Sequence, residues 1–145
     1  MLITPDKTDF FRDDYIAYQQ FKINKNNFKR DLYEKRYKIY SEIIEFLESI
    51  VTHGNVKTDE QIKFYRHTRE NIFLFDDIKI KDHINEIYKQ SNEFQLTNKI
   101  LDRKMKVDDE TYKKAADKDM ELMKWFNEQF DITEKLFSKH LSLKL

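Results

Sequence analysis

The chain has 145 residues, with 27 basic and 27 acidic side chains, one glycine, one proline and no cysteine. A single domain is expected at this length, and the missing cysteine excludes disulfides, thiolate metal sites and cysteine nucleophiles. One glycine and one proline are too few for the turns of a β-sheet protein or for a phosphate-binding glycine loop, so we expect a protein that is nearly all helix. The balanced charge gives no sign of a nucleic-acid partner.

The sequence predicts no membrane-spanning segment. Its longest apolar run covers residues 72–75, whereas a spanning helix needs about 20 apolar residues. The N-terminus is too acidic, and has too few apolar residues, for a signal peptide. We therefore expect a soluble protein of the cytoplasm.

The first helical pattern covers residues 8–21, where aromatic residues recur every three or four positions. Asp6 or Thr8 can cap this helix. The polar stretch NKNN at residues 24–27 predicts a short break, and one long helix through it is the alternative. With the break, the chain divides into an N-terminal helical segment, residues 1–27, and a helical bundle domain, residues 28–145. The aromatic face of the first segment comprises Phe11, Tyr15, Tyr18 and Phe21.

The second helical pattern runs from Phe28 to His53, with its apolar residues on one broad face. On the polar side, Glu34 and Lys38 form a favourable pair at a spacing of four. Gly54 predicts the end of the helix because glycine adopts the left-handed conformation cheaply, and His53 suits the negative helix end.

A capping box at Thr58 and Gln61 predicts a short helix that ends at about Asn71. Its inward candidates are Ile62, Tyr65 and Phe64.

The run IFLF at residues 72–75 cannot place all its side chains on one side of a helix, so we expect it to be buried on several sides. Asp76 or Asp77 then caps a long helix that continues to about Lys104. Its inward positions are Ile80, Ile84, Ile87, Tyr88, Ser91, Phe94 and Leu101.

Asp108 predicts the start of the last helix, and Glu110 supports its first turn. Three helices of roughly 25–30 residues, each about 40 Å long, suit an all-α, elongated antiparallel bundle with one short helix crossing it and a possible extra N-terminal helix. With 12 phenylalanines and eight tyrosines, aromatic rings are expected to fill most of the core. The inward positions of the last helix are Tyr112, Ala115, Ala116, Asp119, Leu122, Met123, Phe126, Phe130, Phe137 and Leu141.

Asp76 and Asp77 form the first candidate site. With Asp82 or Glu70, two neighbouring carboxylates can hold a divalent cation. Adjacent residues at a helix start rarely aim at one point, however, so we interpret the pair as a helix cap. The scattered histidines form no H-x-x-x-H or E-x-x-H motif, and we expect no metal site and no cofactor.

Arg66 and Arg69 precede the same corner and form the second candidate site. They can bind the carboxylate or phosphate of a ligand together with Asp76 and Asp77. Internal ion pairs with these aspartates or with a neighbouring helix are the simpler interpretation. The serines lack the small flanking residues of a nucleophile turn, so we expect no catalytic residue and no enzymatic activity.

Three stretches together resemble an uncharacterised family of small bacterial all-helical proteins: YEKRYKIYSEIIEFL (33–47), FYRHTRENIFLFDDIKIKDHINEIY (64–88) and ELMKWFNEQFDITEKLF (121–137). The family pattern is E-K-R-[FY]-x-[IV]-Y, then T-R-x-x-x-F-L-F, then W-F-x-x-Q-F, and the resemblance covers roughly residues 28–141. It implies no known activity and no catalytic residues. Members often carry a membrane-spanning helix before the shared region, which implies tethering of a longer parent; the first 27 residues here are polar and aromatic instead.

Two functional hypotheses follow. The first is a non-catalytic protein-interaction module of a bacterial cytosolic protein, which binds a protein partner or associates with itself through the aromatic face of residues 8–40. The alternative is a helical bundle that binds a small ligand or a metal between its helices.

Overall fold

The computed structural model describes residues 7–103 and 105–142, with side chains from Arg12 onward. No strand occurs in the described residues, and the prediction of an all-helical protein is confirmed. None of the helices it describes combines the length and the apolar character that a membrane crossing requires. The helices within these limits are α1 (Lys7–His53), α2 (Thr58–Thr68), α3 (Asn71–Leu74), α4 (Ile78–Leu101) and α5 (Asp109–Ser138).

Helix α1 runs without interruption for 47 residues, which corresponds to about 70 Å. The predicted break at residues 24–27 is wrong, and the alternative of one long helix is confirmed. The asparagines there weaken a helix by only about 0.7 kcal/mol each relative to alanine, and neither proline nor glycine interrupts it. Thr8 lies inside α1, whereas the other predicted cap, Asp6, lies outside the described residues. The division of the chain at residue 27 stays a prediction.

The end of α1 agrees with its sequence signal. Gly54 adopts φ 67°, and its N–H donates to the carbonyl oxygen of Ile50 at 2.8 Å. His53 Nδ1 lies 2.8 Å from the carbonyl oxygen of Ser49, another of the last α1 carbonyls. Both predictions for this helix end are confirmed.

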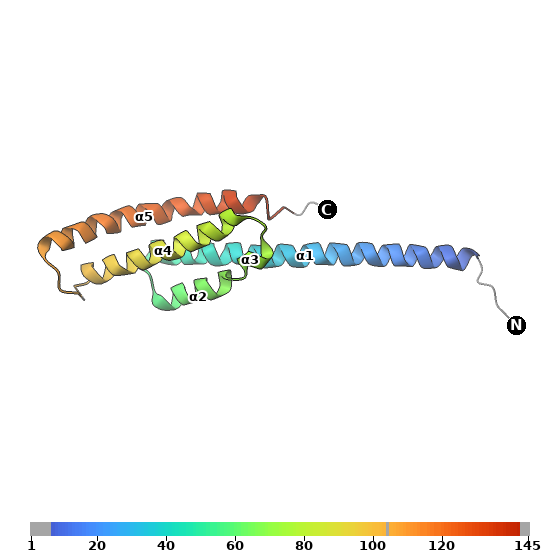
Figure 1. Ribbon diagram of the computed structural model, residues 1–145, viewed down its shortest axis with the longest axis horizontal. Coiled ribbons are helices and arrows are strands. Elements are labelled where there is room, and N and C mark those ends of the chain that lie inside the picture. The colour runs from blue at the N-terminus through green and yellow to red at the C-terminus, as the bar shows by residue number, and fades with distance from the viewer. Residues whose placement is uncertain (1–6, 104, 143–145) are drawn as a thin grey trace.

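The remaining helices gather around the C-terminal half of α1 (Figure 1). Helix α5 contacts both α1 and α4 along its length, and α2 contacts the same two helices. In Figure 1 α4 runs in the same direction as α1, and α5, which contacts both, runs in the opposite direction. We call residues 36–142, which make up this compact part, the body.

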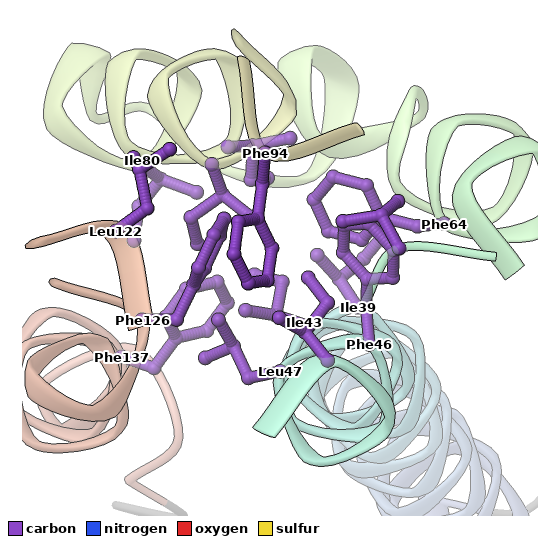
Figure 2. Packing of buried hydrophobic residues seen from close by; sticks show 14 of the residues in the cluster. Ile39, Ile43, Phe46, Leu47, Phe64, Ile80, Phe94, Leu122, Phe126 and Phe137 are labelled. Atoms are coloured by element: carbon purple, nitrogen blue, oxygen red, sulfur yellow. The ribbon is translucent and has the colours of Figure 1, made fainter. Parts of the chain in front are cut away.

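Aromatic rings join the helices of the body at its centre (Figure 2). The rings of Phe46 and Phe64 stack with their centroids 4.5 Å apart, which links α1 to α2. Phe94 and Phe126 lie 5.5 Å apart between α4 and α5. Phe126 has no exposed surface, but only six of the sixteen buried apolar residues described are phenylalanine, six are isoleucine, and none is tyrosine. The prediction that aromatic rings fill most of the core is therefore wrong. Other buried members of this core are Ile39, Ile43, Leu47, Ile50, Ile80, Ile84, Ile87, Leu122 and Phe137.

Helix α2 differs from its prediction in both its cap and its buried face. No side chain caps its start. The Gln61 side chain is buried instead, and its Nε2 donates to Ser91 Oγ and to Asn92 Oδ1, each at 2.8 Å. A helix of only three turns has room for a narrow contact face, which here consists of Gln61, Phe64 and Thr68. Ile62 and Tyr65 are therefore exposed, and their predicted burial is wrong.

The corner at residues 72–75 is also less buried than predicted. Phe75 is buried, but Ile72 and Phe73 are 52% and 84% exposed. Their segment folds as the single turn α3, which presents two successive side chains to the outside. Of the two predicted caps for α4, Asp77 is the one found: its carboxylate accepts from Lys79 N–H at 3.0 Å.

The last two helices otherwise follow their patterns. The Asp108 cap is confirmed, since its carboxylate accepts from Thr111 N–H at 2.7 Å. Helix α4 ends at Leu101, before its predicted end at Lys104, which lies outside the described residues. The predicted positions buried along α4 are Ile80, Ile84, Ile87, Ser91 and Phe94.

Candidate interaction surface

The predicted carboxylate pair is split between two environments. Asp76 is exposed, whereas the Asp77 side chain is 10% exposed and lies 2.9 Å from His140 Nε2 and 3.1 Å from Lys139 Nζ. Hydrogen bonds from His140, from Lys139 and from the Lys79 N–H hold the pKa of the Asp77 carboxyl well below its usual range. Asp77 therefore ties the start of α4 to the end of α5.

A third helix joins this corner through Arg36, which the sequence did not single out. Its Nε donates to the Leu74 carbonyl oxygen at 2.8 Å, and its guanidinium lies over the Phe75 ring, 5.4 Å from the centroid. Its Nη1 reaches the carbonyl oxygen of His140 at 3.5 Å. Arg36 and Asp77 together hold α1, α3, α4 and the end of α5 in one place. The corner is thus an internal joint with its polar groups occupied.

Arg66 and Arg69 form none of the polar contacts of this joint, although Arg69 lines a hollow together with Leu74. Both are exposed, and neither forms an ion pair with a described residue, so the predicted pairing with Asp76, Asp77 or a neighbouring helix is wrong. The four candidate ligand-binding residues are not brought together. Arg69 alone faces a hollow of about 160 Å³ between α2 and α4, which Lys81 also lines.

The described residues contain no group of three or more histidines and carboxylates placed to hold a metal ion. The one histidine in contact with a carboxylate at the corner is His140, and there the partner is a single oxygen of Asp77.

Two buried polar contacts escaped the sequence reasoning. His83 faces α5, and its Nε2 lies 2.7 Å from Thr133 Oγ1. Because the Thr133 hydroxyl donates to the Gln129 carbonyl oxygen at 2.6 Å, it accepts from an Nε2–H of His83. Burial lowers the pKa of this imidazole from 6.5 to about 4. Elsewhere, Asp119 accepts from Thr97 and Asn98, and burial raises the pKa of its carboxyl.

Six of the exposed large hydrophobic side chains lie in the N-terminal part of α1. We call residues 12–31 the extension; Figure 1 shows it projecting beyond the body with no described helix beside it. Eighteen of its twenty residues are exposed and Gln19 and Lys29 are half-buried. Tyr18, Phe21 and Phe28 are 61%, 65% and 68% exposed.

These aromatic residues are in phase with the buried side of α1. Inside the body α1 buries Ile39, Ile43, Phe46 and Ile50, at steps of three and four. The same steps continued toward the N-terminus pass through Leu32 and then through the extension. We call the set they reach the extension face: Asp14, Tyr18, Phe21, Lys25, Phe28 and Leu32.

The extension face thus continues the buried side of α1 with exposed aromatic side chains. No protein-family model, curated protein or solved structure matches this chain.

Proposed function

We propose that this chain is a non-catalytic protein-interaction module of a bacterial cytosolic protein. Its stable part would be the body, an elongated antiparallel helical bundle, and its contact surface the extension face. The observation that supports this is a helix face that is buried against the body at residues 39–50, half-buried at Leu32 and exposed over residues 14–28.

The energetics of the extension favour a partner. Fully burying an aromatic or aliphatic side chain stabilises by about 1.5–3 kcal/mol, and three aromatic rings stand exposed in one row. A helix of some twenty residues without tertiary packing is only marginally stable in water. A partner along the extension face would supply the missing burial and hold the helix together.

A test compares two variants of the full chain. The first replaces Tyr18, Phe21 and Phe28 by glutamine, a good helix former that removes the apolar surface. The matched control replaces Ile16 and Ile23, which are exposed on the other side of the same helix, by glutamine. We expect the first variant to lose self-association in light scattering, or capture of its partner, while the control keeps it and both retain the Tm of the body. A triple variant that associates as well as the wild type would contradict the proposal.

The hollow at Arg69 supports a second candidate function, the binding of a small anion. Arg69 and Lys81 both line it without an ion pair to a described residue, and Tyr65, Asn71 and Asn85 add hydrogen-bonding groups. Its volume of about 160 Å³ is below the roughly 300–1,000 Å³ of ordinary ligand sites, which limits it to a ligand of a few atoms. Titration calorimetry with inorganic phosphate and with acetate, on wild type and on Arg69→Gln, tests this: no heat with either anion would remove the candidate.

A further inference from the structure

We infer that the extension face binds the extension of a second copy of this chain in the antiparallel orientation. In the proposed register, the residue numbers of two facing positions, one from each copy, add up to 39. This inference rests on the proposed function and names its partner. It follows from the spacing of the apolar residues, from the placement of two charges among them and from the side of α1 that the body already covers.

The spacing is that of a two-stranded coiled coil. Tyr18, Lys25 and Leu32 are seven residues apart, and so are Asp14, Phe21 and Phe28. Alternating steps of three and four between the two series produce the seam along which two helices pack. Four of these six positions are aromatic or aliphatic, and the two exceptions, Asp14 and Lys25, carry opposite charges.

These two charges select the register. In an antiparallel pair each member of the first series faces a member of the second. When facing positions add up to 39, Tyr18 meets Phe21 of the second copy, and Asp14 meets its Lys25. Because the pair of helices has twofold symmetry, each of these two contacts occurs twice. A shift by one heptad either way would set Lys25 against Phe21 or Asp14 against Tyr18, which leaves buried charges unpaired. A polar residue in the seam is the usual device by which coiled coils fix their register.

The same charges disfavour a parallel pair. In parallel each residue faces its own counterpart, so Asp14 would meet Asp14 and Lys25 would meet Lys25, both unfavourable. The fold gives a second reason. From Arg36 onward this side of α1 is covered by the chain's own α3, α2 and α5, so a parallel partner helix could not continue past the extension.

The antiparallel arrangement avoids that obstacle. With facing positions adding up to 39, Leu32 lies opposite Lys7, the first residue of α1, so this lysine stands at the end of the paired segment. The overlap covers residues 7–32, about 39 Å at 1.5 Å per residue, and the two bodies lie at opposite ends. Ile16 and Ile23 point away from the seam and stay exposed, which is why they serve as the control above.

Charge reversal tests the register. Asp14→Lys places lysine against Lys25, and Lys25→Asp places aspartate against Asp14. By sedimentation velocity across a wide concentration range we expect each single variant to weaken the dimer by about tenfold or more, and the double variant to restore it. A parallel pair would show no such restoration, because like charges would face each other in all three variants. Single variants that dimerise as tightly as the wild type would overturn the inference.

Spin labels test the direction independently, and the chain has no cysteine to interfere. Ile16→Cys and Arg30→Cys carry labels on the outer side of the extension. In the proposed register position 16 faces position 23, so the two labels are offset along the axis by 7 residues, about 10 Å. Position 30 faces position 9, and its labels are offset by 21 residues, about 31 Å. A parallel dimer gives nearly the same short distance for both labels.

The outcomes separate this inference from the proposed function. A wild-type chain that stays monomeric at every concentration overturns the self-pairing. If the triple glutamine variant then still differs from its control in capturing another protein, the proposed function stands alone. If the triple variant does not differ from its control, both the self-pairing and the proposed function are refuted.

Discussion

His83 makes the stability of the body depend on pH in a predictable direction. The residue is 9% exposed, and its Nε2 lies 2.7 Å from Thr133 Oγ1. Burial lowers its pKa from 6.5 to about 4, so between these values the unfolded chain binds a proton that the folded chain does not. The stabilisation is therefore complete above pH 6.5 and is lost as the pH falls toward 4. Between about pH 7.5 and 4.5 this group alone removes about 2 kcal/mol from the free energy of unfolding.

Urea unfolding of wild type and His83→Gln at those two pH values measures this loss. Glutamine keeps an N–H donor for Thr133 but does not ionise. Other titrating groups, such as Asp119, whose raised carboxyl pKa acts in the opposite direction, are present in both proteins and cancel in the difference. We expect the wild type to lose about 2 kcal/mol more than the variant on acidification, which is about 1 M in the urea midpoint. Equal losses in the two proteins would refute the assignment of His83 as a buried neutral base.

Three further substitutions test the joints of the fold. Asp77→Asn should lower the Tm, whereas Asp76→Asn, at its exposed neighbour, should leave it unchanged. The stabilisation by Asp77 is present above its ordinary pKa of 3.8 and is lost at lower pH. The Tm values of the two variants should therefore converge in acid. Phe126→Ala should reduce the free energy of unfolding by about 3–5 kcal/mol because the ring is fully buried, whereas Phe73→Ala, at a residue 84% exposed, should change it by less than about 0.5 kcal/mol in the same urea titration. Gly54→Ala should lose about 1 kcal/mol through its φ of 67° alone, since the added Cβ would lie 3.8 Å from Met123, an ordinary contact.

Helix class, helix ends and most core positions were predictable because they depend on neighbours in sequence. Gly54, Asp77 and Asp108 act on backbone groups within four residues of themselves. Their outcome is therefore fixed by local geometry. The predicted stripe of α4 agrees at Ile80, Ile84, Ile87, Ser91 and Phe94. On α5, Ala115, Leu122, Phe126 and Phe137 are buried as predicted, whereas the buried Gln129 and Thr133 were not predicted.

The errors lie where a tertiary contact competes with a local one. Gln61 fits a capping box, yet Ser91 and Asn92, thirty residues away, take its amide instead. Arg36 was not singled out in the sequence, yet its Nε donates to the carbonyl oxygen of Leu74, 38 residues away. Neither partner is visible from spacing alone, because no periodicity links positions on different helices.

The candidate site was the least predictable part. Asp77 is held by His140 and Lys139, which follow it by more than sixty residues. The arginines expected at that corner face the outside instead. Two neighbouring carboxylates therefore say little about a shared site when one of them caps a helix and the other stays exposed.

The exposed apolar residues of this chain fall into two kinds, and the difference bears on function. Ile72 and Phe73 are exposed because one short turn cannot turn both inward, and no helical pattern extends from them. Tyr18, Phe21 and Phe28 are exposed although they continue, step by step, the face that α1 buries in the body. The apolar periodicity of a helix predicts which side will be buried, but not whether the packing partner belongs to the same chain. At the extension no other part of the chain that the structure describes covers this side of α1. The proposed second copy would cover it, and the opposite charges at positions 14 and 25 fit that copy.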